Sequence, residues 1–132
     1  MVLITGATGL IGAHIALELM LANKKVRALK RSTSSLEGIK SLFEKNKQKV
    51  LWDQIEWVEG DVTDITTLDE AFKDVKEVYH IAGRVSFDDR ESKELYEVNI
   101  KGTANMINFS ILNGVERFLY MSSIAVMDSI NN

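Results

Sequence analysis

Short apolar runs alternate with longer segments of helical periodicity along this chain. Such runs are typical of strands buried in a parallel sheet, whereas apolar residues three and four positions apart indicate amphipathic helices. The pattern predicts strands at Met1–Thr5, Lys25–Leu29, Ile55–Glu59, Val78–Ala82 and Arg117–Ser122. It predicts helices at Leu10–Ala22, Ser34–Lys47, Thr66–Val75 and Lys93–Asn113. Because strands and helices alternate, we expect an α/β fold with a parallel sheet and right-handed crossovers.

Individual segments carry further signals. Ile55–Glu59 alternates apolar and acidic residues, which favours an edge strand. Ser32–Ser35 supply cap candidates for the second helix, and Asp64 or Thr66 caps the third. His80 lies in an apolar run, so we interpret it as a satisfied core histidine rather than a catalyst. The aromatic residues assigned to packing are Trp52, Trp57 and Tyr96.

A glycine-rich segment, TGATGLIG at residues 5–12, joins the first strand to the first helix. Gly6 suits a tight turn, Gly9 lets a pyrophosphate approach the backbone, and Gly12 lets the helix lie close to the sheet. The amides that open the helix and its dipole favour an anion. The segment therefore predicts dinucleotide binding rather than a simple turn. The candidate binding residues are Gly6, Thr8, Gly9, Leu10, Ile11 and Gly12.

Four further motifs follow along the chain: GDVTD at 60–64, HIAG at 80–83, NIKGTAN at 99–105 and YMSSIAV at 120–126. With the glycine segment, they make the whole chain resemble the extended short-chain dehydrogenase/reductase superfamily. It is most similar to the branch of dihydroflavonol-reductase-like proteins and sugar-nucleotide epimerases. The resemblance implies one incomplete Rossmann-type domain over residues 1–132, with about five strands in the order 3-2-1-4-5.

The resemblance also implies a set of cofactor contacts. Asp61 would accept a hydrogen bond from the adenine amino group, with Val62 beside the ring. Ala82 and Gly83 would pass close to the nicotinamide ribose. In the alternative interpretation, Asp61 only caps the turn at Asp64.

Two further residues match catalytic positions of the superfamily. Ser123 would hydrogen-bond the reacting oxygen of the substrate, whereas Ser122 suits a structural role at the strand end. Asn99 would support the active site, unless it lies on a polar helix face. The family's proton donor is a tyrosine followed four positions later by lysine. This chain has other residues there: Gly83 after Tyr79, Ile100 after Tyr96 and Ile124 after Tyr120. We therefore expect this chain to be the N-terminal part of a longer enzyme and to be inactive by itself.

The second strand ends in Lys30 and Arg31, where enzymes that prefer NAD usually carry an acidic residue. Two cations suit the 2′-phosphate of NADP, so we favour NADP, with NAD as the alternative. The other interpretation is a solvated basic strand end, because Lys24, Lys25 and Arg27 are close by in the sequence.

Composition disfavours several other classes of function. The chain lacks cysteine, has two histidines far apart and carries a net charge of -3, which disfavours metal sites, nucleic acid and anionic membranes. No apolar run approaches the roughly 18 residues of a membrane span. Because the sequence opens directly with a strand, we expect no signal peptide and a cytoplasmic location.

These signals predict a parent epimerase, dehydratase or reductase that transfers hydride to or from a carbonyl or alcohol. Its small-molecule substrate would be a sugar nucleotide or a small aldehyde or ketone. The alternative is a non-catalytic NADP-binding sensor or scaffold. We also expect a homodimer or other self-association, because the apolar strand end at Phe118–Met121 forms a sheet edge and the Lys93–Asn113 helix loses cover.

Overall fold

The computed structural model describes residues 1–86 and 88–123. Five strands form one parallel sheet in the order β3-β2-β1-β4-β5, as predicted. Their bounds are β1 (Val2–Thr5), β2 (Val26–Lys30), β3 (Glu56–Glu59), β4 (Glu77–His80) and β5 (Arg117–Tyr120). β1 is central and fully buried, because its apolar side chains face helices on both sides of the sheet. Both the class of fold and the strand order predicted from the sequence are therefore confirmed.

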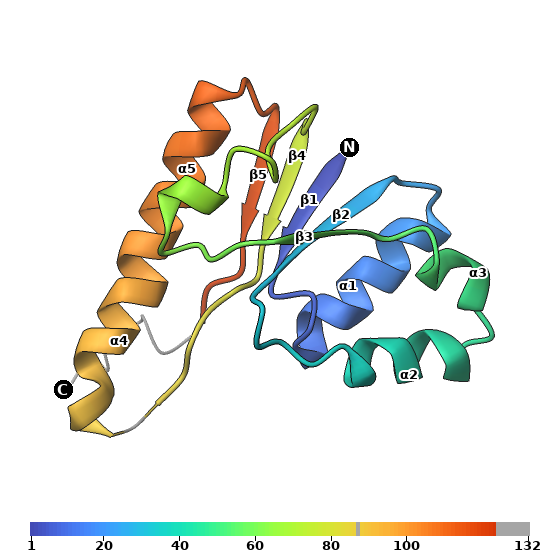
Figure 1. Ribbon diagram of the computed structural model, residues 1–132, viewed down its shortest axis with the longest axis horizontal. Coiled ribbons are helices and arrows are strands. Elements are labelled where there is room, and N and C mark those ends of the chain that lie inside the picture. The colour runs from blue at the N-terminus through green and yellow to red at the C-terminus, as the bar shows by residue number, and fades with distance from the viewer. Residues whose placement is uncertain (87, 124–132) are drawn as a thin grey trace, which may run out of the picture.

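Helices cover both faces of the sheet (Figure 1). One layer contains α1 (Leu10–Leu21), α2 (Glu37–Lys45) and α3 (Lys49–Trp52). The other contains one long helix, made of α4 (Ser92–Tyr96), the π-helical segment η3 (Glu97–Gly102) and α5 (Thr103–Leu112). Short 3-10 turns are η1 (Ile65–Thr67) and η2 (Asp89–Glu91). Each layer buries a separate apolar cluster against the sheet.

The structure differs from the sequence prediction in the segment before β4. The helix predicted at Thr66–Val75 is wrong, because only the short turn η1 forms there and irregular turns follow it. Asp64 does cap this turn, accepting a hydrogen bond from the Thr66 amide. The buried Arg27 side chain explains the irregular path. Its Nη1 donates to the carbonyls of Glu70, Ala71 and Lys73, at 3.3, 3.0 and 2.6 Å, so these carbonyls are satisfied without a continuous helix.

Three smaller corrections concern the helices and their aromatic residues. The second predicted helix is shorter than expected and is followed by α3. The last predicted helix is continuous but changes to π-helical geometry in its middle. Trp52 and Trp57 pack as expected, with ring centroids 5.6 Å apart. Tyr96 does not, since it is 54% exposed and its ring lies 5.8 Å from the Lys101 ammonium nitrogen.

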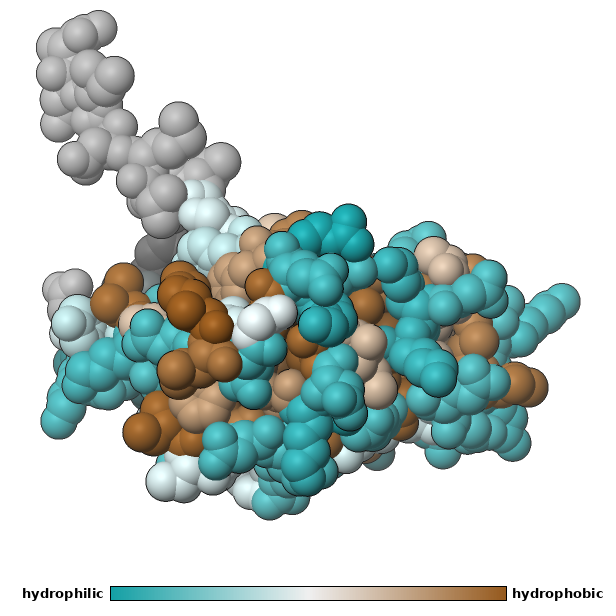
Figure 2. Space-filling view, turned by 90° about the horizontal axis from the view of Figure 1, so that it is seen from above, coloured by the Kyte–Doolittle hydropathy of each residue, from teal (hydrophilic) through white to brown (hydrophobic). Residues whose placement is uncertain are grey.

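Apolar side chains also reach the surface. Figure 2 shows brown apolar patches set among polar side chains on the face that it presents. The long helix contributes Ile100, Ile107, Ile111 and Leu112, and the end of β5 contributes Leu119 and Tyr120. None of the helices in the described ranges has the length and apolar content needed to cross a membrane.

The role of Arg27 gives a first testable prediction. We expect Arg27→Leu to lower the free energy of unfolding by about 3 kcal/mol, because three carbonyls and Glu56 lose a buried donor. Arg117→Leu is the matched control, since Arg117 pairs with Glu77 at the surface and such pairs contribute little. Urea unfolding measures both. Equal effects of the two substitutions would contradict the assigned role.

Candidate functional site

The candidate residues lie together because parallel strands all end at one edge of the sheet. The glycine loop follows β1, Lys30 ends β2, and the Gly60–Asp64 turn follows β3. Residues 81–84 follow β4, and Ser122 and Ser123 follow β5. In open α/β sheets, ligands bind at the carboxyl edge, at the point where the strand order reverses; here that point lies between β1 and β4. The fold therefore brings segments that are far apart in the sequence to one surface.

The glycine loop has two positions at which the fold itself requires glycine. Gly6 has a φ of +72°, and a Cβ there would lie 2.7 Å from the amide nitrogen of Ala82. A Cβ on Gly12 would lie 2.1 Å from the carbonyl oxygen of Gly6. A Cβ on Gly9 would lie 3.4 Å from the same oxygen, which is close to ordinary contact. Glycine at position 9 is thus not demanded by packing, and it keeps the surface of the loop open.

Helix α1 begins with its amides uncapped by any side chain. Gly9 is the N-cap residue and has extended backbone, with no side-chain hydrogen bond to the first turn. Leu10 and Ile11 are 80% and 53% exposed, so neither side chain folds back over the helix start. A groove of about 410 Å³ runs from this loop between α1 and α2. The helix start consequently offers backbone donors and a positive dipole end to an anion.

The two cations at the end of β2 differ in their surroundings. The ammonium nitrogen of Lys30 lies 3.7 Å from a carboxylate oxygen of Glu59, which offsets part of its charge. The Arg31 side chain is exposed, and its backbone amide donates to the Ser34 hydroxyl. Arg27, which appeared to be part of a solvated basic region, is instead buried. Arg31 is therefore the more available cation at this edge.

The turn after β3 is fixed by short polar side chains. Asp61 Oδ1 accepts from the Thr63 amide at 2.9 Å and from its hydroxyl at 2.7 Å. Asp61 thus caps the turn that the Asp64 amide closes on the Asp61 carbonyl, as the alternative interpretation held, while Asp64 caps the following 3-10 turn. An adenine contact of Asp61 stays a prediction. Val62 is only 6% exposed, because it packs in the apolar cluster that contains Leu29, Leu68 and Met106. Asp61 is the more accessible of the two predicted adenine contacts.

The loop after β4 is held from both sides. The Ala82 amide donates to the Thr5 hydroxyl at 3.1 Å. Asn99, in the π-helical segment, binds both backbone groups of Arg84 at 2.8 Å, one through each atom of its amide. Asn99 therefore does not lie on a free polar face, and it supports the loop in which Gly83 is exposed.

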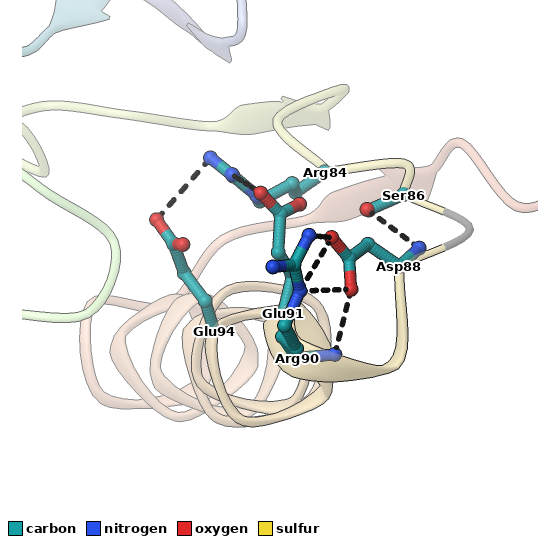
Figure 3. A network of polar contacts seen from close by, with 6 residues as sticks. All are labelled: Arg84, Ser86, Asp88, Arg90, Glu91 and Glu94. Atoms are coloured by element: carbon teal, nitrogen blue, oxygen red, sulfur yellow. Dashed lines mark hydrogen bonds and ion pairs between the residues drawn. The ribbon is translucent and has the colours of Figure 1, made fainter.

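A cluster of charged residues beside this loop was not found by sequence reasoning (Figure 3). The Arg84 guanidinium lies 3.1 Å from Glu91 and 3.2 Å from Glu94, so two carboxylates neutralise it. A hydrogen bond from Ser86 and the charge of Arg84 lower the pKa of Glu91 below its ordinary value. Charged loop residues normally suggest a solvated surface, and only their meeting in space shows that they brace the loop.

His80 is fully buried between the two sides of the site. Its Nδ1 lies 2.7 Å from the Thr5 hydroxyl, and its Nε2 lies 3.0 Å from the Thr103 hydroxyl. Its ring packs against those of Phe118 and Tyr120. Burial lowers the pKa of His80 from its ordinary value near 6.5 to about 4. The interpretation of His80 as a satisfied core histidine agrees with this geometry.

The strand end that carries the candidate catalytic serine is exposed. Ser122 and Ser123 follow β5 after Met121 and are exposed. The remainder of the predicted motif, residues 124–126, lies outside the described residues. The position of Ser123 at the carboxyl edge of the sheet is compatible with the role that the resemblance implies, which stays a prediction.

Two glycines make a matched test of the loop geometry. Gly12→Ala is expected to destabilise the fold strongly, because the new methyl group would meet backbone at 2.1 Å. Gly38→Ala, in α2, meets nothing within 4 Å and should stabilise the fold by about 0.5 kcal/mol through helix propensity. Thermal unfolding measures both variants. A well-tolerated Gly12→Ala would show that the loop has another path.

The buried histidine predicts a pH dependence of stability. Because the pKa of His80 is lower in the folded chain, the unfolded chain binds more protons between pH 6.5 and 4. This contribution is complete above pH 6.5, and about 3 kcal/mol is lost as the pH falls to 4. His80→Phe should lack this component, whereas His14→Gln, at an exposed position, should keep it. Urea unfolding at several pH values measures the difference, and identical profiles for all three chains would refute the prediction.

Comparisons with known proteins agree with this geometry. The sequence matches the NAD dependent epimerase/dehydratase family over residues 2–131. It is 32% identical to the sterol demethylase protein B of Methylococcus capsulatus, covering 92% of this chain and 34% of that protein. It is 30% identical to the UDP-glucose 4-epimerase of Mus musculus, covering 95% and 38%.

A solved structure from Agrobacterium tumefaciens, a short-chain dehydrogenase/reductase superfamily protein with bound NAD, shares the fold. Its TM-score is 0.75 at 24% identity, covering 95% of this chain and 33% of that one. The chain spans about a third of the length of the curated relatives it matches. The resemblance drawn from the five motifs is confirmed, because the match takes in the glycine loop and all five strands. The chain belongs to the NAD dependent epimerase/dehydratase family.

Proposed function

We propose that this chain binds NADP at the carboxyl edge of its sheet. The observation that carries the proposal is the open start of α1, where no side chain caps the amides and Leu10 and Ile11 turn outward. The diphosphate would lie on these amides and approach the backbone at Gly9. Asp61 would hold the adenine end, and Ala82 and Gly83 would border the nicotinamide ribose. A dinucleotide suits this arrangement, because the candidate contacts, with Lys30 and Arg31, lie at the ends of four neighbouring strands, β3, β2, β1 and β4.

The preference for NADP over NAD rests on the two cations at the end of β2. Arg31 is exposed, and a guanidinium can bind a phosphate through two parallel hydrogen bonds. Lys30 would add charge, reduced by its ion pair with Glu59. We therefore assign the 2′-phosphate mainly to Arg31, with Lys30 in a supporting role.

We propose that the parent protein is an oxidoreductase or epimerase that acts on a carbonyl or alcohol. The nicotinamide ring supplies hydride transfer when the cofactor is bound. Ser123 would donate a hydrogen bond to the reacting oxygen, and Asn99 would keep the Arg84 backbone in place beside it. A sugar nucleotide or a small aldehyde or ketone is the proposed substrate class. The names of the relatives include both a reductase and a sugar-nucleotide epimerase.

A second candidate function is a non-catalytic NADP-binding sensor or scaffold. It differs from the enzyme in having no tyrosine followed four positions later by lysine, a pair that is absent from residues 1–132. A reading frame that continues with such a pair would support the enzyme, and one without it would support the sensor. Retention of Ser123 favours the enzyme, because a sensor needs no hydrogen bond to a reacting oxygen.

We also propose that the chain self-associates, as a homodimer or through the edge of its sheet. Leu119, Tyr120 and Met121 are partly exposed along or just beyond the edge strand β5. Unpaired backbone at such an edge is a template for further strand pairing.

The cofactor proposal predicts a difference between nucleotides. NADP should bind more tightly than NAD, and Arg31→Ala should weaken NADP by about tenfold or more, since it removes a charge-assisted hydrogen bond. The same substitution should leave NAD unchanged. Lys30→Ala should have a smaller effect, because Glu59 already offsets its charge. Isothermal titration calorimetry of the three chains with both nucleotides measures this.

Gly9→Val provides the matched control for the site itself. It should reduce the affinity for both nucleotides, because its side chain would occupy the surface of the loop. NAD binding equal to or tighter than NADP would overturn the preference for NADP, and binding unaffected by Gly9→Val would overturn the proposed site.

The missing acid–base pair predicts that this chain has no useful turnover. General acid–base catalysis contributes roughly 100-fold to 10,000-fold, and the tyrosine that supplies it in the family has no counterpart here. We expect no NADPH oxidation above background with a panel of aldehydes, ketones and sugar nucleotides. Absorbance at the reduced nicotinamide band measures it. A clear rate that Ser123→Ala abolishes would show that the active site is complete by another route.

A further inference from the structure

We propose that His80 is a positioning residue for the nicotinamide end of the cofactor site, because its ring joins the two sides of the loop around Gly83 through one directed chain of hydrogen bonds. The inference rests on the proposed function, since it concerns a part of the same site. It goes beyond that function by giving a role to a buried side chain that contacts neither cofactor nor substrate.

The direction of this chain of hydrogen bonds follows from Thr103. Its hydroxyl lies 2.7 Å from the carbonyl oxygen of Asn99, and a carbonyl can only accept, so the hydroxyl proton is used there. The same hydroxyl oxygen lies 3.0 Å from Nε2 of His80. It must accept this second hydrogen bond, and Nε2 therefore carries the ring proton.

The direction of the other hydrogen bonds follows from the neutral state of the His80 ring. A neutral imidazole has one proton, so Nδ1 is bare and accepts from the Thr5 hydroxyl at 2.7 Å. The oxygen of Thr5 in turn accepts from the Ala82 amide at 3.1 Å. The lowered pKa of His80 keeps the ring neutral at pH 7. Each hydroxyl donates once and accepts once, so a single arrangement of protons satisfies every group.

The network of hydrogen bonds surrounds Gly83. It starts at the amide of Ala82 and runs through the ring to the carbonyl of Asn99. The Asn99 side chain then binds both backbone groups of Arg84. Gly83 thus lies between two residues whose backbone is fixed by one network, and a Cβ on it would lie 3.5 Å from Asn99 Oδ1. The ring therefore determines where the exposed backbone beside the ribose lies.

A packing role alone makes a different prediction. The ring of His80 stacks on Tyr120, with centroids 5.7 Å apart, and meets Phe118 at 6.1 Å. Phenylalanine would keep these aromatic contacts and lose both hydrogen bonds. If only packing matters, such a variant binds cofactor normally once it is folded. If the network matters, the nicotinamide half of the cofactor loses its place while the adenosine half does not.

The first measurement tests the network without any cofactor. Nitrogen-15 NMR of the imidazole at pH 7 distinguishes a protonated nitrogen from a bare one. We expect a bare Nδ1 and a protonated Nε2 in the unchanged chain. The opposite tautomer, or two protonated nitrogens, would overturn the proposal.

The second measurement uses two ligands and a matched pair of variants. NADPH carries both halves of the cofactor, whereas adenosine 2′,5′-bisphosphate carries the adenosine half only; NADH and adenosine 5′-phosphate serve as the parallel pair. Thr103→Val removes the hydroxyl at nearly constant shape, and Thr103→Ser keeps it. We expect Thr103→Val and His80→Phe to weaken NADPH about tenfold, the value of one hydrogen bond, and to reduce the fluorescence of bound reduced nicotinamide. The adenosine ligands should bind unchanged, and Thr103→Ser should restore NADPH binding.

The outcomes separate the two proposals. Dinucleotide binding that is unaffected by the variants, an equal loss for whole and half cofactor, or no recovery with Thr103→Ser would each overturn the role of His80 alone. Failure of the unchanged chain to bind any of the four ligands would overturn the proposed function, and the role of His80 with it.

Discussion

The close approach of α1 to the end of β1 is the contact on which the rest of the site depends. Gly12 lies so near the Gly6 carbonyl that no side chain fits between them. This contact sets the position at which the helix begins, and the uncapped amides then point to the carboxyl edge of the sheet. Gly6 simultaneously touches the backbone at Ala82, so the loop after β4 is placed by the same glycines. One backbone contact thus aligns the two loops that would hold opposite ends of a dinucleotide.

Polar side chains hold the backbone of the loops that this contact aligns. Thr5, Asn99 and Asp61 each bind backbone groups in the loops, rather than one another. Backbone held in this way is already ordered before a ligand arrives, which lowers the entropic cost of binding. The charged groups around Arg84 add a second brace on the outer side of the loop (Figure 3). The site is therefore built mainly from loop backbone, with side chains acting as its supports.

Buried apolar runs and a glycine loop are local signals, and from them the sequence predicted the strands. The order of the strands came from the resemblance to a known superfamily, because the pairing of distant strands leaves no local signal. The sequence failed at residues 66–75, where apolar spacing is helical but a distant side chain, Arg27, binds the carbonyls that a helix would use. The role of Asn99 was left open, since only the fold shows that Arg84 lies opposite it. The π-helical segment was also missed, because one change of hydrogen-bond pattern leaves little trace in hydrophobic periodicity.

That π-helical segment gives the long helix two separate alignments. Residues before it, such as Glu94, face the loop after β4, whereas Met106 and Ser110 after it face the buried core. A π-helical turn holds one more residue than an α-helical turn. Deleting one residue between Glu97 and Gly102 would therefore convert this turn to α-helical geometry and leave both halves of the helix on their present faces. The same deletion within α5 would instead rotate the residues after it by roughly a quarter of a turn and turn them away from the core. What the extra residue sets is the local path of the turn that carries Asn99, and with it the support of the loop at Arg84.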